Sequence, residues 1–476
     1  MDIILFILQT IVLFGAIFLG VRFGGIGIAF CAGIGVLLLG ILGLKVQPFP
    51  VMSCTGEAAS TCSLGSGYIP FDVVGIIMAV IGAIAAMQVA GGLDFLVNWA
   101  EKILRKHPKH ISIYAPIISW LMTVMCGTGN TSIALCPVIV EVAKDSNVRP
   151  SRPLAISVVA SQIAITASPI SAAVVWLAGQ LETMTDMTKT VDGQTVPVGY
   201  LANVGYVQLL AVSIPASFIA ILLVGIIMSI TDKKPLDQDP EYQRRLAAGA
   251  VATRQPGTTY VAKPGAKASV AIFLSAVVVI CVYAILISSN VGVIKNPTID
   301  RTAGIIAIML AAGAFIVIVG KCKVSEILNV STFKAGMNAA ICIISVAWLG
   351  TIYVNGHMTT IQAFAKDVLT GQPWLLAVVL FFASALLYSQ ASTARAMMPI
   401  AFAAGMSPVA IVASFAAVSG LFVLPTYPTL LAAVQMDDTG STRIGKYVFN
   451  HPFFVPGVAT IAIAVVAGFG LGAIIL

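Results

Sequence analysis

The chain consists largely of apolar runs close to the length that crosses a lipid bilayer. Hydrophobic residues make up 59% of its 476 residues, and only 9% are charged. A helix needs about 20 apolar residues to span the hydrocarbon core, and in lipid every backbone polar group has to be paired internally. The sequence therefore predicts an all-α polytopic membrane protein. The first twenty residues lack the basic segment and cleavage site of a secretory signal, so we expect them to form the first helix.

Two of the apolar stretches are interrupted near their middle. Residues 111–143 are divided by the polar turn 127–130, and residues 373–404 are divided by the polar turn 389–393. Each half is too short to span a bilayer, so we expect each stretch to form a re-entrant hairpin that enters and leaves on the same side. The other runs then give ten spans, near 3–21, 24–44, 71–92, 153–180, 206–230, 269–288, 303–320, 336–354, 407–436 and 453–475.

The distribution of Lys and Arg supports this topology. With the N-terminus outside, 20 of the 26 basic residues fall on the cytoplasmic side, five fall outside and Arg395 lies within an apolar stretch. Such a bias is what the positive-inside rule expects. The topology predicts a multi-pass membrane protein whose N- and C-termini are both periplasmic.

The predicted elements repeat in the same order with opposite orientation. Residues 1–230 form the first repeat, with hairpin 111–143 and broken helix 153–180. A cytoplasmic linker spans 231–268. Residues 269–476 form the second repeat, with hairpin 373–404 and broken helix 407–436. Polar breaks in equivalent places of two inverted halves are typical of secondary transporters, whose sites lie near the bilayer midplane.

These breaks expose the N-termini of half-helices, which carry partial positive charge and free N–H groups suited to a carboxylate. Two inverted hairpins supply two such sites, which suits a molecule with a carboxylate at each end. The candidate substrate-binding residues are Gly127, Thr128, Gly129, Asn130, Thr131, Ser132, Ser168, Pro169, Ser171, Ser389, Gln390, Ser392, Thr393, Arg395, Pro425, Thr426, Tyr427 and Thr429.

Arg395 is the strongest of these candidates. A cation inside the bilayer costs about 2.5–3.5 kcal/mol on insertion scales, so it needs water, a partner or an anion. Its alternative role is structural, paired with backbone carbonyls of the hairpin. The Ser, Thr and Asn candidates could equally be N-caps, the glycines and prolines could only shape the turns, and Tyr427 could be a packing aromatic. Acidic residues at the span ends, such as Asp94 and Asp437, are interpreted as solvated or paired.

At these same residues the chain resembles the anaerobic four-carbon dicarboxylate uptake (Dcu) family of bacterial inner membranes, and it is most similar to the aspartate/fumarate/succinate branch. The resemblance covers nearly the whole length. It is carried by AMQVAGGLD at 86–94, CGTGNTSIALCPVI at 126–139, SQIAITASPISAAVV at 161–175 and the long segment from VLPTYPT to FFVPG at 423–457.

The resemblance implies membership of the broader ion-transporter superfamily, with a scaffold domain, a mobile domain that holds the hairpins, and elevator-type alternating access. It implies a homodimer in lipid that exchanges fumarate, malate or aspartate for succinate in anaerobic respiration, together with a proton-coupled uptake mode. It implies no cofactor, no metal and no nucleic-acid partner.

Other functions were weighed against this one. A cation-coupled symporter of another organic anion, such as citrate, is the nearest alternative, and a dicarboxylate sensor without flux is another. A membrane enzyme is disfavoured because HExxH and a GxSG elbow within a span are absent, and an ATP-driven subunit because GxxxxGK[ST] is absent. Cys54 and Cys62 share a polar loop in which a disulfide is an open question.

Overall fold

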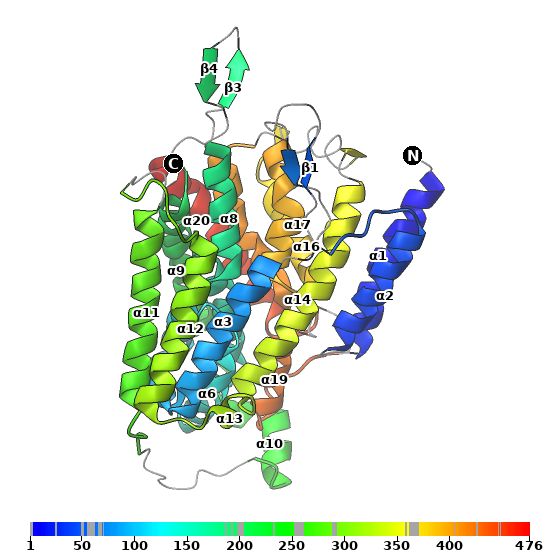
Figure 1. Ribbon diagram of the computed structural model, residues 1–476. Helices are drawn as coiled ribbons and strands as arrows, with labels where there is room; N and C mark the ends of the chain where they lie inside the picture. The colour runs from blue at the N-terminus through cyan, green and yellow to red at the C-terminus, as the bar shows by residue number, and fades with distance from the viewer. Residues whose placement is uncertain are drawn as a thin grey trace.

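The computed structural model is built almost wholly from helices, with two small antiparallel β-hairpins (Figure 1). One hairpin pairs β1 (Met52–Cys54) with β2 (Cys62–Leu64) and sets Cys54 opposite Cys62 in its register; the other pairs β3 (Thr188–Val191) with β4 (Gln194–Pro197). The structure describes the chain except for residues 1–2, 24–25, 49–51, 55–61, 65–68, 70, 186–187, 192–193, 198–203, 232–233, 252–260, 288–292, 358, 361–370, 405, 425–426, 446 and 448.

The first four helices include one that the sequence analysis missed. They are α1 (Ile3–Phe23), α2 (Gly27–Ile41), α3 (Phe71–Val89) and α4 (Gly92–Lys106). The chain bends by 75° between α3 and α4, at Gly91, whose φ of +84° favours glycine. Helix α4 buries Leu93, Leu96, Ala100 and Leu104 along one face, which is the spacing of an amphipathic helix.

Each predicted hairpin is a pair of short helices, followed by a broken helix and a long helix. In the first half these are α5 (Ile111–Cys126), after the short turn η1 (Pro108–His110), α6 (Thr131–Asp145), α7 (Ser151–Ile163), η2 (Ala164–Ala167), α8 (Ala172–Thr185) and α9 (Tyr206–Thr231). In the second half they are α16 (Leu375–Leu387), α17 (Gln390–Ala403), α18 (Pro408–Ser414), η4 (Phe415–Phe422), α19 (Pro428–Met436) and α20 (Phe454–Ile475). The element order is thus the same in both halves, and the inversion across the membrane stays a prediction.

The remaining elements connect the halves and begin the second. The linker holds η3 (Leu236–Gln238) and α10 (Pro240–Ala247), and the second half opens with α11 (Ala266–Leu286), α12 (Arg301–Gly320), α13 (Val324–Ile327) and α14 (Ser331–Gly356).

The helices pack as two groups. Helices α1–α4 contact α11–α14, chiefly through α3 with α12 and α14 and through α2 with α14, and we call this group the panel body. Helices α5–α9 contact α16–α20, chiefly through α9 with α20 and α8 with α17, and we call this group the hairpin body. Close approach across the panel body uses glycine: a Cβ on Gly336 of α14 would lie 2.2 Å from Ile81 of α3.

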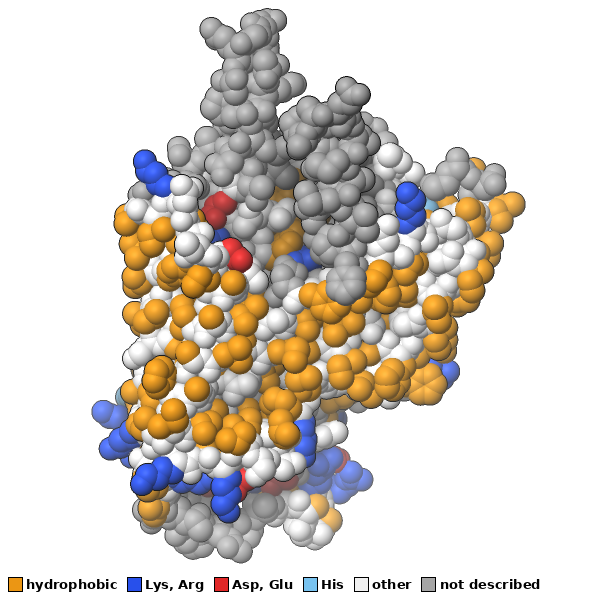
Figure 2. All heavy atoms as spheres, viewed as in Figure 1, with side chains coloured by type: hydrophobic (Ala, Val, Ile, Leu, Met, Phe, Trp, Pro, Cys, Tyr) orange, Lys and Arg blue, Asp and Glu red, His pale blue; other side chains and the backbone are white. Residues whose placement is uncertain are grey.

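The surface matches a membrane protein. Figure 2 shows hydrophobic side chains over the middle of the visible face and Lys and Arg gathered toward one end. Among the described residues, seven helices are long and apolar enough to span, or eight if the bent α3–α4 pair counts as one span. Two of the ten predicted spans do not meet that length: α2 has 15 residues, and 407–436 is divided between α18, η4 and α19. The fold is that of a multi-pass helical membrane protein, as predicted. The predicted number of ten spans is not confirmed, because seven or eight are found among the described residues.

Candidate functional site

The tip of the first hairpin depends on a glycine. Helix α5 ends at Gly127, which has a φ of +67° and whose N–H donates to the carbonyl of Thr123 at 2.8 Å. A Cβ at this position would lie 2.8 Å from Cγ1 of Ile170, so the turn needs glycine both for its backbone and for its packing. The hydroxyls of Thr131 and Ser132 donate to the carbonyls of Thr128 and Gly129 at 3.1 and 2.8 Å. These two hydroxyls therefore stabilise the turn itself.

The second tip repeats this geometry with a bulky residue. Helix α16 ends at Tyr388, which has a φ of +54° and whose N–H donates to the carbonyl of Ser384 at 3.1 Å. A left-handed conformation is unfavourable for a non-glycine residue and is often found at functional sites. Ser389 then caps α17 by accepting from the N–H of Ser392 at 3.2 Å, and the hydroxyl of Thr393 donates to the carbonyl of Ser389 at 2.8 Å. The side chain of Tyr388 is thereby placed at the tip.

The first broken helix is held by its own serines. The hydroxyl of Ser168 donates to the carbonyl of Val124 on α5, and the hydroxyl of Ser171 donates to the carbonyl of Ile165, each at 2.7 Å. The hydroxyl of Tyr206 donates to the carbonyl of Pro169, also at 2.7 Å. Both serines are buried. Ser171 thus satisfies backbone of the break itself, and Ser168 satisfies a carbonyl at the C-terminal end of α5.

Gln162 lies where the tips and the second broken helix meet. Its side chain is fully buried, and its nitrogen donates to the hydroxyl of Thr429 on α19 at 3.1 Å. Its backbone oxygen accepts from the amide of Gln390 and the hydroxyl of Ser419, each at 3.2 Å. A Cβ on Gly129 would lie 2.8 Å from its side-chain nitrogen. One amide residue therefore connects the first tip, the second tip and both parts of the second broken helix.

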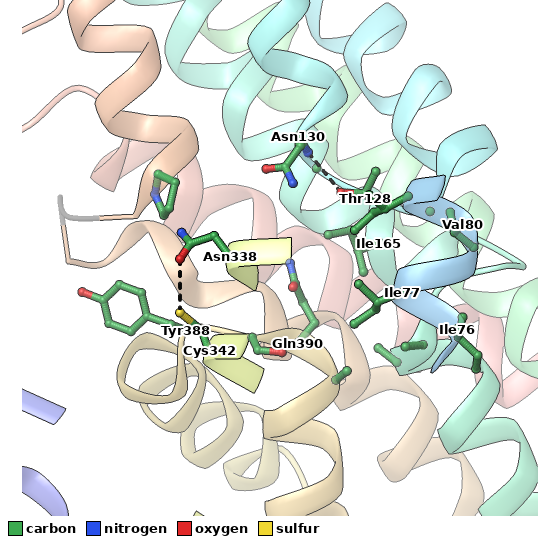
Figure 3. Close-up of a pocket in the computed structure, with 18 of the residues that line it drawn as sticks. Ile76, Ile77, Val80, Thr128, Asn130, Ile165, Asn338, Cys342, Tyr388 and Gln390 are labelled. Carbon is green, nitrogen blue, oxygen red and sulfur yellow. Dashed lines mark hydrogen bonds between the residues drawn. The ribbon is translucent and has the colours of Figure 1, made fainter. Parts of the chain in front are cut away.

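A cavity of about 190 Å³ opens between the two tips and the panel body (Figure 3). The hairpin body supplies one wall, and α2, α3 and α14 supply the other. Its lining residues are Ile28, Ile76, Ile77, Val80, Ile81, Gly127, Thr128, Gly129, Asn130, Ile133, Ile165, Ile170, Ala172, Ala173, Asn338, Cys342, Val346, Leu387, Tyr388, Ser389, Gln390, Ala391, Tyr427 and Pro428.

None of the described residues that line this cavity is charged at neutral pH. Its strongest polar groups are the carboxamides of Asn130, Asn338 and Gln390, with the hydroxyls of Thr128, Ser389, Tyr388 and Tyr427. The N-termini of α6 and α17 begin at or beside these residues. An anion in the cavity would therefore be stabilised by helix ends and neutral hydrogen-bond donors.

Arg395 is not among the residues that line the cavity in the described part of the chain. It lies one helical turn beyond Ala391 on α17, and its guanidinium carbon is 5.8 Å from the ring centre of Trp176, which is a cation–π distance. Trp176 in turn lies one turn beyond the lining residue Ala172 on α8. Arg395 and Trp176 thus lie directly behind the residues that line the cavity, one helical turn further along α17 and α8.

The structure divides the candidate residues that the sequence identified into three sets. Those that line the cavity are Gly127, Thr128, Gly129, Asn130, Ser389, Gln390 and Tyr427. Those placed around it are Thr131, Ser132, Ser168, Pro169, Ser171, Ser392, Thr393, Arg395 and Thr429, most of them buried. Pro425 and Thr426 lie outside the described residues.

The sequence analysis did not identify the residues of the panel-body wall, nor Gln162, whose hydrogen bonds connect the two tips and the second broken helix. Asn338 carried a usable signal, because it is a carboxamide near the start of the predicted span 336–354. Tyr388 directly precedes the predicted tip. The apolar residues of α3 carried no such signal, because Ile and Val are equally expected on a lipid-facing surface.

Comparison with known proteins gives consistent matches along the chain. Residues 5–476 match the family described as anaerobic C4-dicarboxylate membrane transporters. The C4-dicarboxylate transporter DcuA of Wolinella succinogenes is 52% identical over 470 residues, which cover 99% of this chain and 100% of that protein. DcuA of Escherichia coli K12 is 49% identical with the same coverage.

More distant proteins also match. The anaerobic C4-dicarboxylate transporter DcuB of Escherichia coli O6:H1 is 34% identical over 476 residues, with 98% of each chain covered. Among solved structures, the YdaH transporter of Alcanivorax borkumensis is 15% identical, with a TM-score of 0.49 and coverage of 94% of this chain and 96% of that one.

Proposed function

The chain belongs to the family of anaerobic C4-dicarboxylate membrane transporters, a family of carriers and not of enzymes, and from that premise we propose that it transports C4-dicarboxylates across the bacterial inner membrane, mainly by exchange. Fumarate, succinate, malate and aspartate are the proposed substrates. The observation that supports this most is the cavity between the two tips. It has helix N-termini on the hairpin side and a largely apolar panel wall, which matches a molecule with two carboxylates and a hydrocarbon middle.

Exchange also agrees with the electrostatics of the cavity. The described residues that line the cavity include no cation. They therefore bind a dianion less tightly than a lining with a fixed positive charge would. A carrier must release its substrate on the far side, and helix ends with hydroxyl and amide donors suit moderate affinity. Each carboxylate is proposed to lie near one tip, with Thr128 and Asn130 at the first, and with the hydroxyl of Ser389 and the N-terminus of α17 at Gln390 at the second.

The proposed orientation places the end with α10 and α13 in the cytoplasm. Figure 2 shows Lys and Arg gathered at that end, and both termini lie at the opposite end with β3 and β4 (Figure 1). The positive-inside rule then makes the termini periplasmic.

Alternating access is proposed to be of the elevator type. The cavity is bounded on one side by the hairpin body and on the other by the panel body, so sliding of the hairpin body would carry both tips and the substrate together. The ion pair between Glu182 of α8 and Arg301 of α12, at 2.8 Å, joins the two bodies and would have to open during such a movement. The homodimer is part of the same proposal and rests on the family resemblance.

The test is counterflow in proteoliposomes. Vesicles loaded with unlabelled succinate should take up labelled fumarate, malate and aspartate, and empty vesicles should take up much less. An imposed pH gradient tests proton-coupled uptake. Uptake that needs a sodium gradient, or that favours citrate, would replace this proposal by a cation-coupled symporter.

A further inference from the structure

The panel-body wall of the cavity has one strongly polar side chain among the described residues. Helices α2 and α3 contribute Ile28, Ile76, Ile77, Val80 and Ile81, and α14 contributes Asn338, Cys342 and Val346. A thiol is a weak donor and acceptor, whereas a carboxamide has two donor hydrogens and two acceptor positions. Asn338 is therefore the group through which this wall can form strong hydrogen bonds.

Among the described residues, few groups use the hydrogen-bonding capacity of Asn338. Within the described part of the chain, its one recorded partner is the thiol of Cys342, whose sulfur lies 4.0 Å from Oδ1. The side chain is only half-buried, and it lies beside the space that Asn130 and Gln390 approach from the other body (Figure 3). A carboxamide with so few protein partners beside a cavity is available to a ligand.

The proposed substrate has a part that would face this wall. Its two carboxylates are assigned to the tips of the hairpin body, so the two middle carbons are turned toward α3 and α14. Fumarate and succinate carry only hydrogen on those carbons, and the isoleucines of α3 suit them. Malate carries a hydroxyl there and aspartate an ammonium group, and each of these needs a polar partner when it leaves water.

We propose that Asn338 is a specificity-determining residue, which accepts a hydrogen bond from the C2 hydroxyl of malate or the C2 ammonium of aspartate. The proposal rests on the proposed function and deepens it, because it adds to a general dicarboxylate carrier the ability to take C2-substituted dicarboxylates. The same side chain can also donate to the malate oxygen. The unsubstituted substrates make no such contact, so their transport should depend on Asn338 much less.

The experiment compares selectivity and not activity alone. Four purified proteins are compared: wild type, Asn338→Leu, Asn338→Ser and the control Val346→Ala. Each is reconstituted into vesicles that contain succinate. Apparent KM and maximal rate are then measured with labelled succinate, fumarate, malate and aspartate. Leu keeps the approximate size of Asn and removes its hydrogen bonds, whereas Ser keeps a hydroxyl. Val346→Ala changes a lining residue of the same helix without changing its hydrogen bonding.

In Asn338→Leu, the rate at low substrate should fall roughly tenfold for malate and aspartate relative to succinate, the size expected for one lost hydrogen bond. The fumarate-to-succinate ratio should stay at the wild-type value. Asn338→Ser should recover part of the malate and aspartate uptake, and Val346→Ala should leave all ratios unchanged.

Other results separate the two proposals. An equal loss for all four substrates in both Asn338 variants, or wild-type ratios in Asn338→Leu, would overturn the role of Asn338 and leave dicarboxylate exchange intact. Absence of counterflow in the wild type for all four substrates would instead overturn the proposed function.

Discussion

The carboxamide nitrogen of Gln390 lies 3.2 Å from the backbone oxygen of Gln162 and 3.3 Å from its side-chain oxygen. This contact joins the second tip to the end of α7, across 228 residues of sequence. Gln390 lines the cavity, and Gln162 is fully buried behind it. Gln162 is therefore a positioning residue, which acts on the site through the groups it holds.

The first prediction is that Gln162→Leu raises the apparent KM for fumarate and succinate by about tenfold, with a smaller change in maximal rate. The substitution removes the side-chain partner of the Thr429 hydroxyl and one of the two acceptors of the Gln390 amide, which keeps its bond to the backbone oxygen of residue 162. A buried polar group that loses its partner costs about 1–3 kcal/mol. Counterflow kinetics and the melting temperature should be measured on the same preparation. Ser157→Ala, on the same helix, is the control, because the hydroxyl of Ser157 is buried and makes no hydrogen bond to Gln162. A lower melting temperature with unchanged KM would make Gln162 purely structural.

The second prediction separates a lining residue from a buried one. Asn130→Ala should raise the KM for each dicarboxylate about threefold to tenfold, because its carboxamide faces the cavity and one hydrogen bond contributes about 0.5–1.5 kcal/mol. The matched variant is Thr393→Val at the other tip, where the hydroxyl donates to the carbonyl of Ser389 within its own helix. Its KM should stay near the wild-type value. A wild-type KM in Asn130→Ala together with a raised KM in Thr393→Val would indicate that the substrate contacts side chains of α17 and not those of the first tip.

Much of the fold could be predicted because lipid imposes strong rules. The polar turns at 127–130 and 389–393 interrupt apolar runs, and unpaired backbone in a membrane is expected only beside a cavity or within protein. Both turns do separate short helices at the cavity. The predicted span 71–92 ends beside the bend at Gly91, but α4 itself was not predicted, because its sequence is not apolar enough to resemble a span.

The site could be predicted only in part, for a physical reason. Reasoning from polar breaks identifies groups that are close in sequence to the tips, such as Asn130 and Gln390. It does not show which hydroxyls turn inward to satisfy backbone, as those of Ser168 and Ser171 do. Nor does it identify a partner from another element, as with Gln162 and Asn338, since those contacts depend on how α7 and α14 pack.

The third prediction uses the cysteine that lines the cavity. A variant that keeps Cys342 as its single cysteine should react with a small polar maleimide, and fumarate or succinate should slow the reaction several-fold, because the substrate would occupy the space beside the thiol. The control variant keeps only Cys281, which lies on α11 and is not among the described lining residues. Equal protection of both thiols would indicate a general conformational change, and no protection of Cys342 would place the substrate elsewhere.

The last prediction concerns Arg395, whose charge lies one helical turn from the cavity. At roughly 10 Å and an effective dielectric constant of about 20, a unit charge stabilises a carboxylate by about 1.7 kcal/mol. Arg395→Gln should therefore raise the KM for all four dicarboxylates by about tenfold and to a similar extent. A direct ion pair with one carboxylate would instead cost about 2–5 kcal/mol and raise the KM by far more than tenfold.

Two variants of the Arg395 and Trp176 pair separate charge from packing. Arg395→Lys keeps the charge and should recover most of the affinity, although it loses the planar guanidinium over Trp176. Trp176→Leu removes the ring and keeps the charge, so its KM should stay below that of Arg395→Gln. Because partly buried charges are screened by salt much less than exposed ones, the difference between wild type and Arg395→Gln should change little as ionic strength rises. A wild-type KM in Arg395→Gln at low salt would show that the cation of α17 serves folding alone, and that the helix ends hold the dianion without it.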